Sequence, residues 1–283
     1  QMINAGKISN KGIELTVGGI PVQNENFRWR TQVNFSTNKN KVEKLADNYK
    51  VFAYGSGVNM AYRMIVKEGG SLGDLYGNSF KRDEGGKIVL DAEGLPELNT
   101  DRQQYLGNSQ PKCTLGWSNT FSFYGVSVNF LIDARIGGDV MSFTQGQLDA
   151  HGVSKAAGDA MDRGYVEVEG QKFTNEEKKN NVQGFYARVG DINGCTEYYM
   201  YKGTNIRLRE LSVSYSLPEK WMEKTKVFKD INLSLVARNL FFFYKDAPFD
   251  PDALMSVGND MQGVDVFGMP TTRSIGFNVK FTF

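Results

Sequence analysis

The sequence predicts an all-β fold in which about nine antiparallel strands form part of a large transmembrane β-barrel with long extracellular loops. Three observations lead to this fold class. Seven stretches alternate apolar and polar residues with a period of two, their apolar positions carry no charge, and long connections between them alternate with short ones. Because successive side chains of a strand point to opposite faces, each stretch is expected to have one apolar face and one polar face.

The final stretch of the chain shows the pattern most clearly. Its apolar positions are Ile275, Phe277, Val279, Phe281 and Phe283, and small or polar residues lie between them. In chain order, the seven predicted strands are Ile13 to Val17, Phe27 to Ser36, Thr114 to Phe123, Val126 to Ile136, Leu211 to Leu217, Ile231 to Ala237 and Arg273 to Phe283. Alternation of this kind indicates strands rather than helices.

The apolar positions of these strands are free of charge. None of roughly 34 such positions is charged, whereas the 23% charged fraction of the chain would place about eight there by chance. Aromatic residues gather toward the strand ends, as they do at membrane boundaries, and several strands are longer than the usual ~5 to 6 residues. A soluble β-sandwich would alternate in the same way, so this pattern alone leaves that alternative open.

The lengths of the connections discriminate better. The short connections are Gly18 to Asn26, Tyr124-Gly125 and Pro218 to Asp230. The long ones are Lys39 to Asn59, Arg82 to Lys112, Gly138 to Thr204 and Tyr244 to Thr272. Short turns on one side and long loops on the other are typical of outer-membrane barrels. To keep this alternation, Met60 to Lys67 and Asp74 to Lys81 are expected to supply one further strand pair.

Composition excludes several classes of protein. The net charge of +1, with scattered charges, argues against a nucleic-acid partner. No run of about 18 apolar residues is present, so a transmembrane helix is not expected. The start at Gln1 lacks the features of a signal peptide. Cys113 and Cys195 have no metal-ligand spacing; two free thiols are favoured, and a disulfide remains the alternative for an oxidising compartment.

Short motifs in these strands resemble the C-terminal part of the SusC/RagA family of TonB-dependent outer-membrane transporters. The motifs follow one another in the family's order over nearly the whole chain. They are Asn10-Lys11-Gly12-Ile13-Glu14-Leu15, Asn26-Phe27-Arg28-Trp29, Asn38-Lys39-Asn40-Lys41-Val42, Leu106-Gly107-Asn108 with Pro111-Lys112, Ser118-Asn119-Thr120-Phe121-Ser122-Phe123, Arg135-Ile136-Gly137-Gly138-Asp139, Ile206-Arg207-Leu208-Arg209-Glu210-Leu211, Ala237-Arg238-Asn239-Leu240, Asp250-Pro251-Asp252 and Phe281-Thr282-Phe283.

The resemblance implies that residues 1–283 are the C-terminal segment of a TonB-dependent receptor β-barrel in the outer membrane of a Gram-negative bacterium. The signal peptide, TonB box and plug domain of family members are absent from these residues. The implied function is active transport of a large nutrient, an oligosaccharide (glycan) or a peptide. The implied partners are a SusD-like surface lipoprotein, the TonB complex acting through the missing plug, the remainder of the barrel, and outer-membrane lipid. Phe281 and Phe283 would form the signal read by the barrel-assembly machinery.

Two groups of side chains are candidates for contact with a substrate. The aromatic residues of the long loop could stack on a sugar or anchor the lipoprotein lid, or could pack the loop against itself; they are Phe185, Tyr186, Tyr198, Tyr199 and Tyr201. The arginines on the polar strand positions are expected to face the barrel lumen and to pair with carboxylates; they are Arg28, Arg30, Arg135 and Arg238.

Catalytic, metal and cofactor sites are not predicted. His151, the only histidine, has no nucleophile motif beside it, and no catalytic residues are expected. The acidic groups Asp246, Asp250 and Asp252, and Asp260 with Asp265, lack calcium-loop spacing and are expected to brace loops. The run Asp91 to Pro96 likewise departs from the acidic loop of many family members. A non-enzymatic transporter is therefore favoured, with a soluble β-sandwich carbohydrate-binding module or a passive porin as alternatives.

Overall fold

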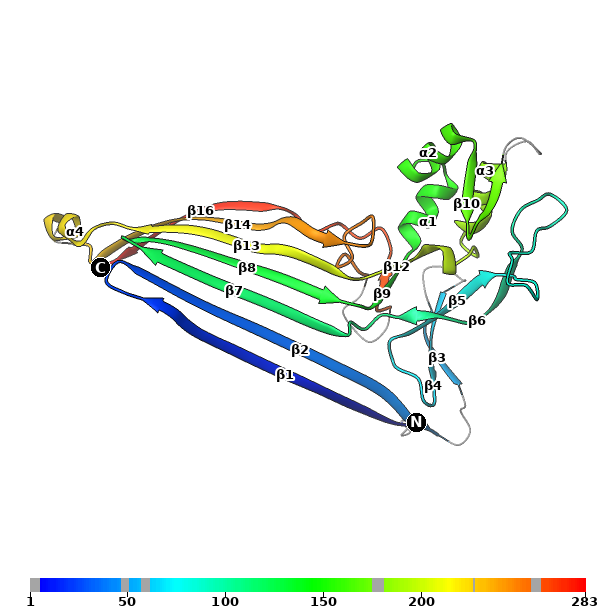
Figure 1. The fold of residues 1–283 in the computed structure, drawn as a ribbon, viewed down its shortest axis with the longest axis horizontal. Coiled ribbons are helices and arrows are strands. Elements are labelled where there is room, and N and C mark those ends of the chain that lie inside the picture. The colour runs from blue at the N-terminus through cyan, green and yellow to red at the C-terminus, as the bar shows by residue number, and fades with distance from the viewer. Residues whose placement is uncertain (1–5, 47–50, 57–61, 175–180, 226, 256–260) are drawn as a thin grey trace.

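Residues 6–46, 51–56, 62–174, 181–225, 227–255 and 261–283 are described by a computed structural model of the chain. Its main feature is a seven-stranded antiparallel sheet with the strand order β1-β2-β7-β8-β13-β14-β16 (Figure 1). The strands are β1 (Gly6–Gln23), β2 (Phe27–Leu45), β7 (Cys113–Phe123), β8 (Val126–Ile136), β13 (Asn205–Ser216), β14 (Asp230–Lys245) and β16 (Ser274–Thr282). All seven strands predicted from alternation lie in this sheet, each beside its neighbours in chain order.

The connections of this sheet alternate between its two ends. Short turns join β1 to β2, β7 to β8 and β13 to β14 at one end, hereafter the turn end, where the C-terminus also lies (Figure 1). The long connections all leave from the opposite, loop end. The turn between β7 and β8 has positive φ at Tyr124 (47°) and Gly125 (81°), the geometry that closes a two-residue hairpin. The turn between β13 and β14 carries helix α4 (Glu219–Thr225).

The long connections build separate structures at the loop end. One forms a four-stranded sheet from β3 (Val51–Ser56), β4 (Tyr62–Lys67), β5 (Asp74–Phe80) and β6 (Leu98–Asn108). The predicted strand pair, Met60 to Lys67 and Asp74 to Lys81, is therefore present from residue 62 on. It does not belong to the barrel wall, however, so the expected number of wall strands was wrong. Since β4 and β5 pair with β3 and β6, the described part of the wall has seven strands rather than nine.

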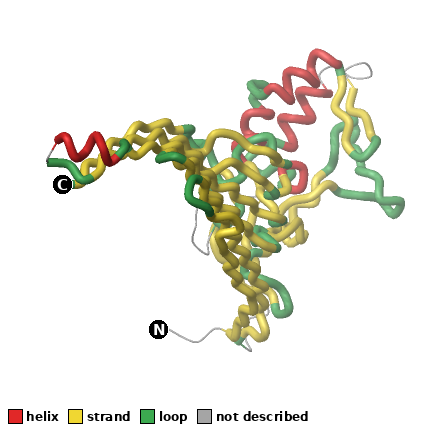
Figure 2. Tube along the Cα trace, turned by 60° about the vertical axis from the view of Figure 1, so that its left-hand side comes forward, coloured by secondary structure: helices red, strands yellow, loops and turns green. Residues whose placement is uncertain are grey.

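The connection from β8 to β13 folds into a helical lobe, which Figure 2 shows at the end of the sheet away from α4 and the C-terminus. Its elements are β9 (Asp139–Ser142), α1 (Phe143–Ala150), α2 (Lys155–Arg163), β10 (Tyr165–Val168), β11 (Gln171–Thr174), α3 (Asn181–Val189), the 3-10 turn η1 (Glu197–Tyr199) and β12 (Met200–Lys202). Hydroxyl caps begin two of the helices: Ser142 accepts from the amide of Gln145, and Ser154 from that of Ala157. β9 also pairs with β15 (Val264–Asp265) of the last long connection.

The hydrophobic core lies in this loop region and not between two large sheets. The largest buried cluster joins the end of β5 and the connection from β5 to β6 with the helical lobe. It includes Phe80, Ile88, Phe173 and Phe185. The apolar face of the seven-stranded sheet is exposed by contrast, at 64% for Ile13 and 69% for Phe277. The three smaller sheets of the described residues lie at the loop end, so none of them covers that face (Figure 1).

No helix in the described part of the chain has the length and hydropathy needed to cross a bilayer.

Candidate functional site

The polar face of the seven-stranded sheet can be followed from strand to strand through its pairing register. Arg28 lies opposite Ser122 and Arg30 opposite Thr120, and these partners lie opposite Ser127 and Asn129 of β8. Hydrogen bonds run along the face, from the Thr120 hydroxyl to Asn129 (2.6 Å) and between the Ser122 and Ser127 hydroxyls (2.9 Å). The sheet thus has one continuous hydroxyl- and amide-rich face opposite its apolar face.

The four predicted arginines all lie on this polar face, in different surroundings. Arg28 and Arg30 are exposed near the turn end. Arg238 makes an exposed ion pair with Glu210 (Nε to Oε2, 3.3 Å). Arg135 is partly buried at the loop end and donates to the carbonyl of Ser109 (2.7 Å).

A denser charge cluster lies at the loop end of the polar face, around Arg207. The Arg207 side chain is 1% exposed and is held between Asp252, which it contacts directly, and Asp250, whose Oδ1 lies 3.8 Å from its Nη2. Its guanidinium also stacks on the Phe242 ring at 4.8 Å. The Thr271 hydroxyl donates to Asp250. These contacts hold the last long connection, from β14 to β16, against the loop end of the sheet.

Arg209 extends this cluster. It contacts Asp133 of β8 and reaches Asp252 at 3.4 Å. Neither Arg207 nor Arg209 was singled out from the sequence as a site residue. The prediction that Asp250 and Asp252 brace a loop fits these ion pairs. Asp265 is buried and accepts a hydrogen bond from the Ser142 hydroxyl (2.6 Å), while Asp260 lies outside the described residues.

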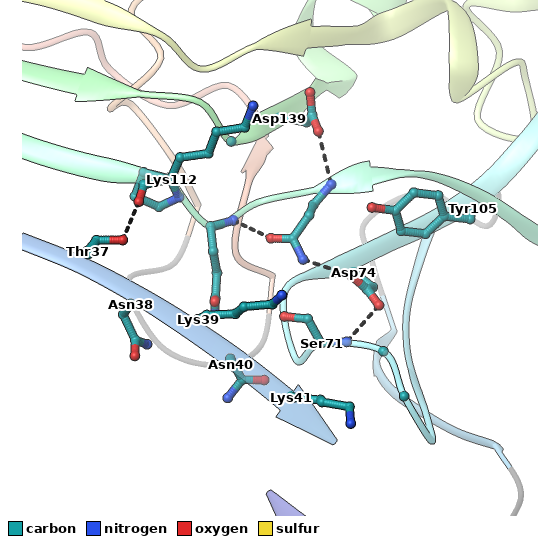
Figure 3. A pocket seen from close by; sticks show the side chains of 16 residues that line it. Thr37, Asn38, Lys39, Asn40, Lys41, Ser71, Asp74, Tyr105, Lys112 and Asp139 are labelled. Atoms are coloured by element: carbon teal, nitrogen blue, oxygen red, sulfur yellow. Dashed lines mark hydrogen bonds between the residues drawn. The ribbon is translucent and has the colours of Figure 1, made fainter. Parts of the chain in front are cut away.

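A polar cavity of about 770 Å³ opens where β2 and β7 part at the loop end (Figure 3). On β2 its wall is residues 37–41; the other walls are the β4–β5 turn, the link from β6 to β7 and the start of β9. A relay of hydrogen bonds crosses it: Asp139 accepts from the Asn108 amide (3.0 Å), and the Asn108 side chain donates to Asp74 (2.7 Å). Across the opening, the Thr37 hydroxyl donates to the carbonyl of Lys112 (2.6 Å).

The hairpin turn of β4 and β5 forms the rim of this cavity. The Gly69 amide donates to the Val42 carbonyl (2.8 Å), and the Val42 amide donates to the Gly70 carbonyl (2.9 Å). Gly69 has φ of 81°, a conformation that glycine adopts without strain. The hairpin thus continues the edge of β2 above the level at which β7 ends. Lined by lysines, carboxylates, amides and one tyrosine, the cavity is suited to a polar, hydroxyl-rich or peptide-like group.

Three of the five candidate loop aromatics are buried and are therefore not exposed for contact with a substrate. Phe185, Tyr186 and Tyr199 are buried in the core of the helical lobe, at 0%, 5% and 2% exposure. Phe185 packs on Phe173 (ring centroids 4.7 Å apart), because the short helix α3 needs an apolar partner. For these three residues the packing alternative is correct. Tyr198 and Tyr201 are partly buried, so contact with a ligand stays a prediction for them.

Burial also governs ionisation in the helical lobe. It raises the pKa values of the Tyr199 and Tyr201 hydroxyls above the usual range for tyrosine. Burial likewise raises the pKa of Asp149, which accepts hydrogen bonds from Gln145 (2.7 Å) and Ser154. These groups pack and brace the lobe and do not line an open cleft.

The remaining predicted residues have simpler surroundings. His151 is exposed, and its Nδ1 lies 2.8 Å from the carbonyl of Gln147. Cys113 and Cys195 are free thiols, and burial raises the pKa of Cys195 to about 12. Phe281 and Phe283 both contact the Phe228 ring, at centroid distances of 5.4 and 5.1 Å. Among the described residues no group of three or more His, Cys, Asp or Glu side chains is arranged to hold a metal ion.

Comparison with known proteins places this arrangement in context. No model of a protein family matches the chain. TonB-dependent receptor P3 of Formosa agariphila is 27% identical over 308 residues, covering 99% of this chain and 29% of its own length. TonB-dependent receptor P39 of the same organism is 24% identical, covering 98% of this chain and 31% of its own length. The chain thus spans about three tenths of the length of the curated relatives it matches.

Solved structures share the fold. The RagAB peptide importer in its closed-closed state aligns with a TM-score of 0.65 at 17% identity, over 99% of this chain and 30% of the other. A structure of the RagAB peptide transporter aligns with a TM-score of 0.64 at 16% identity. The resemblance indicated by the strand motifs is therefore confirmed: the chain is related over its whole length to TonB-dependent receptors and has the fold of part of the SusC/RagA-like RagAB transporters.

Proposed function

We propose that this chain forms part of the wall and outward-facing loops of an outer-membrane importer energised by TonB. The observation that carries the proposal is the uncharged, exposed apolar face of the seven-stranded sheet, opposite a continuous polar face. A lipid-facing band and a polar lumen require this division. In this arrangement the loop end faces outward and the turn end faces the periplasm.

The proposal includes the rest of the barrel. β1 pairs only with β2, and β16 only with β14, within the described residues. Strand edges are not stable in hydrocarbon because their amides and carbonyls would lack partners. The two edges are therefore joined, in the assembled protein, to strands outside residues 1–283, and a plug domain couples the barrel to TonB.

The cargo in this proposal is a large nutrient, an oligosaccharide or a peptide. Support comes from the polar cavity at the loop end and from the similar fold of the RagAB peptide importer. A SusD-like surface lipoprotein would sit on the loop end as a lid. Arg28, Arg30, Arg135 and Arg238 would then face the lumen, and Phe281 and Phe283 would end the strand recognised during barrel assembly.

The alternatives make different demands on the molecule. A soluble β-sandwich needs a second sheet over the apolar face, and among the described residues none lies there. A passive porin would share the two faces of the wall, but would work without TonB. The relatives are named receptors dependent on TonB, which favours the energised transporter.

Two adjacent residues of β14 test the lipid-facing assignment in the full-length protein. Leu235 lies on the apolar face at 52% exposure, and Ser234 lies beside it on the polar face, opposite Ser214. Arginine on the lipid face near the bilayer midplane costs about 2–4 kcal/mol, whereas a polar lumen accepts it. We expect Leu235→Arg to reduce the heat-modifiable, membrane-inserted fraction, and Ser234→Arg to leave it nearly unchanged. Equal effects of the two substitutions would show that the apolar face does not meet lipid.

Growth on the nutrient tests the transport step itself. Cells that depend on the full-length protein for growth on an oligosaccharide or a peptide are compared with and without TonB. Loss of growth without TonB is expected. Growth that continues without TonB would identify a passive porin instead.

A further inference from the structure

The polar cavity at the loop end contains two lysine amines without a carboxylate partner. They belong to Lys39 of β2 and Lys112 of the link from β6 to β7, which line the cavity from two different walls (Figure 3). Both lysines are exposed. The third lysine of the cavity, Lys41, binds Glu43 (3.2 Å), but within the described residues no ion pair joins Lys39 or Lys112 to a carboxylate.

The two carboxylates of the cavity are already engaged. Asp139 pairs with Lys202 (Oδ1 to Nζ, 2.7 Å), and its other oxygen accepts from the Asn108 amide (3.0 Å). Asp74 is 7% exposed, and its oxygens accept from the Ser71 amide (2.8 Å) and from the Asn108 side chain (2.7 Å). Only Asp74 therefore lacks a cationic partner, so one carboxylate stands against two free amines and the cavity keeps a net positive charge.

A cavity with this charge favours an anionic group on the molecule that enters it. An ammonium group is a compact point charge with three donors. Its hydrogen bonds to an anion are shorter than bonds between neutral groups and roughly twice as strong. Because Lys39 and Lys112 belong to different walls, an anionic group in the cavity can be approached from two sides.

Tyr105 indicates what kind of molecule carries the anionic group. Its ring is 58% exposed in the wall of the cavity and rests against the buried Tyr76, with ring centroids 5.6 Å apart at an angle of 75°. An exposed ring held by a buried neighbour offers a flat apolar surface on which a sugar ring can stack. Partial burial and the nearby Asp74 and Asp139 raise the pKa of the Tyr105 hydroxyl, so it remains a hydrogen-bond donor at neutral pH.

The rest of the lining suits a sugar better than a peptide. Pockets that recognise the side chains of a peptide are lined mostly by apolar residues. In the described part of this cavity, Pro111 is the only apolar side chain besides the Tyr105 ring. Amides and hydroxyls such as Asn38, Ser71 and Gln110 take other positions of the lining and match the hydroxyl groups of a sugar.

We propose that the loop-end cavity binds an acidic sugar residue of an oligosaccharide cargo. The inference rests on the proposed transport function and narrows its cargo. The sugar ring stacks on Tyr105, and its carboxylate or sulfate group is bound by Lys39 and Lys112. A neutral sugar makes the stacking contact but leaves both amines without a partner.

The test measures equilibrium binding of a trisaccharide of galacturonic acid to the full-length protein in neutral detergent at low salt. The main comparison is the same trisaccharide after reduction of its carboxyl groups, which leaves neutral galactose. A galactose trisaccharide with sulfate esters is tested beside them. We expect either acidic form to bind about 10-fold more tightly than the neutral one, as one charge-assisted hydrogen bond would provide. The advantage should shrink as salt is raised, because ions screen exposed charges.

Two sets of substitutions separate charge from stacking. Lys39→Gln combined with Lys112→Gln should abolish the preference for the acidic forms. The matched control combines Lys87→Gln with Lys155→Gln, which removes the same charge from two exposed lysines elsewhere in the loop region, and it should keep the preference. Tyr105→Ala should weaken binding of acidic and neutral forms by a similar factor, about 2- to 10-fold, because stacking does not depend on the charge.

Equal binding of the acidic and neutral trisaccharides by the unchanged protein overturns the proposal, whatever the variants do. So does equal or tighter binding of a tripeptide of glutamate, which carries side-chain carboxylates without a sugar ring. Growth on the nutrient that continues without TonB contradicts the proposed function. Growth that requires TonB, together with no preference for the acidic forms, contradicts only this inference about the cargo.

Discussion

The ion cluster around Arg207 gives a quantitative prediction about the last long connection. Arg207 is 1% exposed and paired with Asp250 and Asp252, so Arg207→Met leaves two carboxylates without their main partner. Removing one member of a buried pair typically costs 3–5 kcal/mol. Arg209 still reaches Asp252, and Thr271 still donates to Asp250, so the lower end of that range applies. We expect the connection to open about 3 kcal/mol more easily, which is roughly 150-fold in the opening equilibrium.

Hydrogen exchange measured by mass spectrometry on the full-length protein in detergent reads this opening directly. Peptides covering residues 247–255 and 261–272 should exchange about two orders of magnitude faster in the Arg207→Met variant, while the centre of β13 stays protected. The matched control is Arg238→Ala, on the same face, because its ion pair with Glu210 is exposed and such pairs contribute about 0–1 kcal/mol. If Arg207→Met changes exchange no more than Arg238→Ala does, the buried pair does not hold the connection.

Three further predictions concern the loops and turns. Burial raises the pKa of the Asp91 carboxyl group, but hydrogen bonds from Arg188 and from two turn amides lower it by more, so the net shift of the pKa is downward. Its contribution to stability is thus present above about pH 4. We expect it to be lost as the pH falls through the lowered native pKa, seen as faster exchange of residues 91–95, with Asp91→Asn removing the dependence. Maleimide should leave the buried Cys195 unlabelled in the native protein and label it after denaturation, as counted by mass spectrometry. Gly125→Val should lower thermal stability by about 1–3 kcal/mol because Gly125 has φ of 81°, and Gly125→Asn should cost less; equal melting temperatures would refute the strain argument.

The wall of the sheet could be predicted from the sequence because each of its strands has two distinct environments. One face is apolar and the other polar, so the period of two is visible in residue type, and all seven alternating stretches lie in one sheet, paired in chain order. The loop region offered no such signal. β4 and β5 are buried on both sides, with every residue of β5 buried, so their pattern did not reveal that they pair in a separate sheet.

The burial of part of the loop aromatics has a related physical cause. The sequence left ligand contact and packing of the loop as alternatives, but the connection from β8 to β13 folds into a lobe with its own core, and a lobe of short helices needs aromatic side chains to fill that core. Phe185 and Tyr199 provide this packing. The sequence signal that could have indicated it is the spacing of Val182, Phe185, Tyr186 and Val189, which places these residues on one helical face.

Arg207 was missed because the alternation changes phase in β13. Extending the pattern of Leu211, Val213 and Tyr215 toward the loop end would place Arg209 and Arg207 on the apolar face. The structure avoids this with a bulge between Leu208 and Glu210, where the register with β8 shifts by one residue. Above the bulge Arg207 lies opposite Asp133 and faces the polar side. Two arginines that would lie on the apolar face in a regular strand are thereby turned toward carboxylates. A bulge is thus what allows charge to fasten the last connection without interrupting the apolar face. Deleting Arg209 removes the extra residue and leaves Leu208 opposite Ile132 and Arg207 opposite Asp133 in a regular strand. We therefore expect the full-length barrel to assemble without Arg209, as judged by its heat-modifiable mobility, and loss of assembly would refute this register argument.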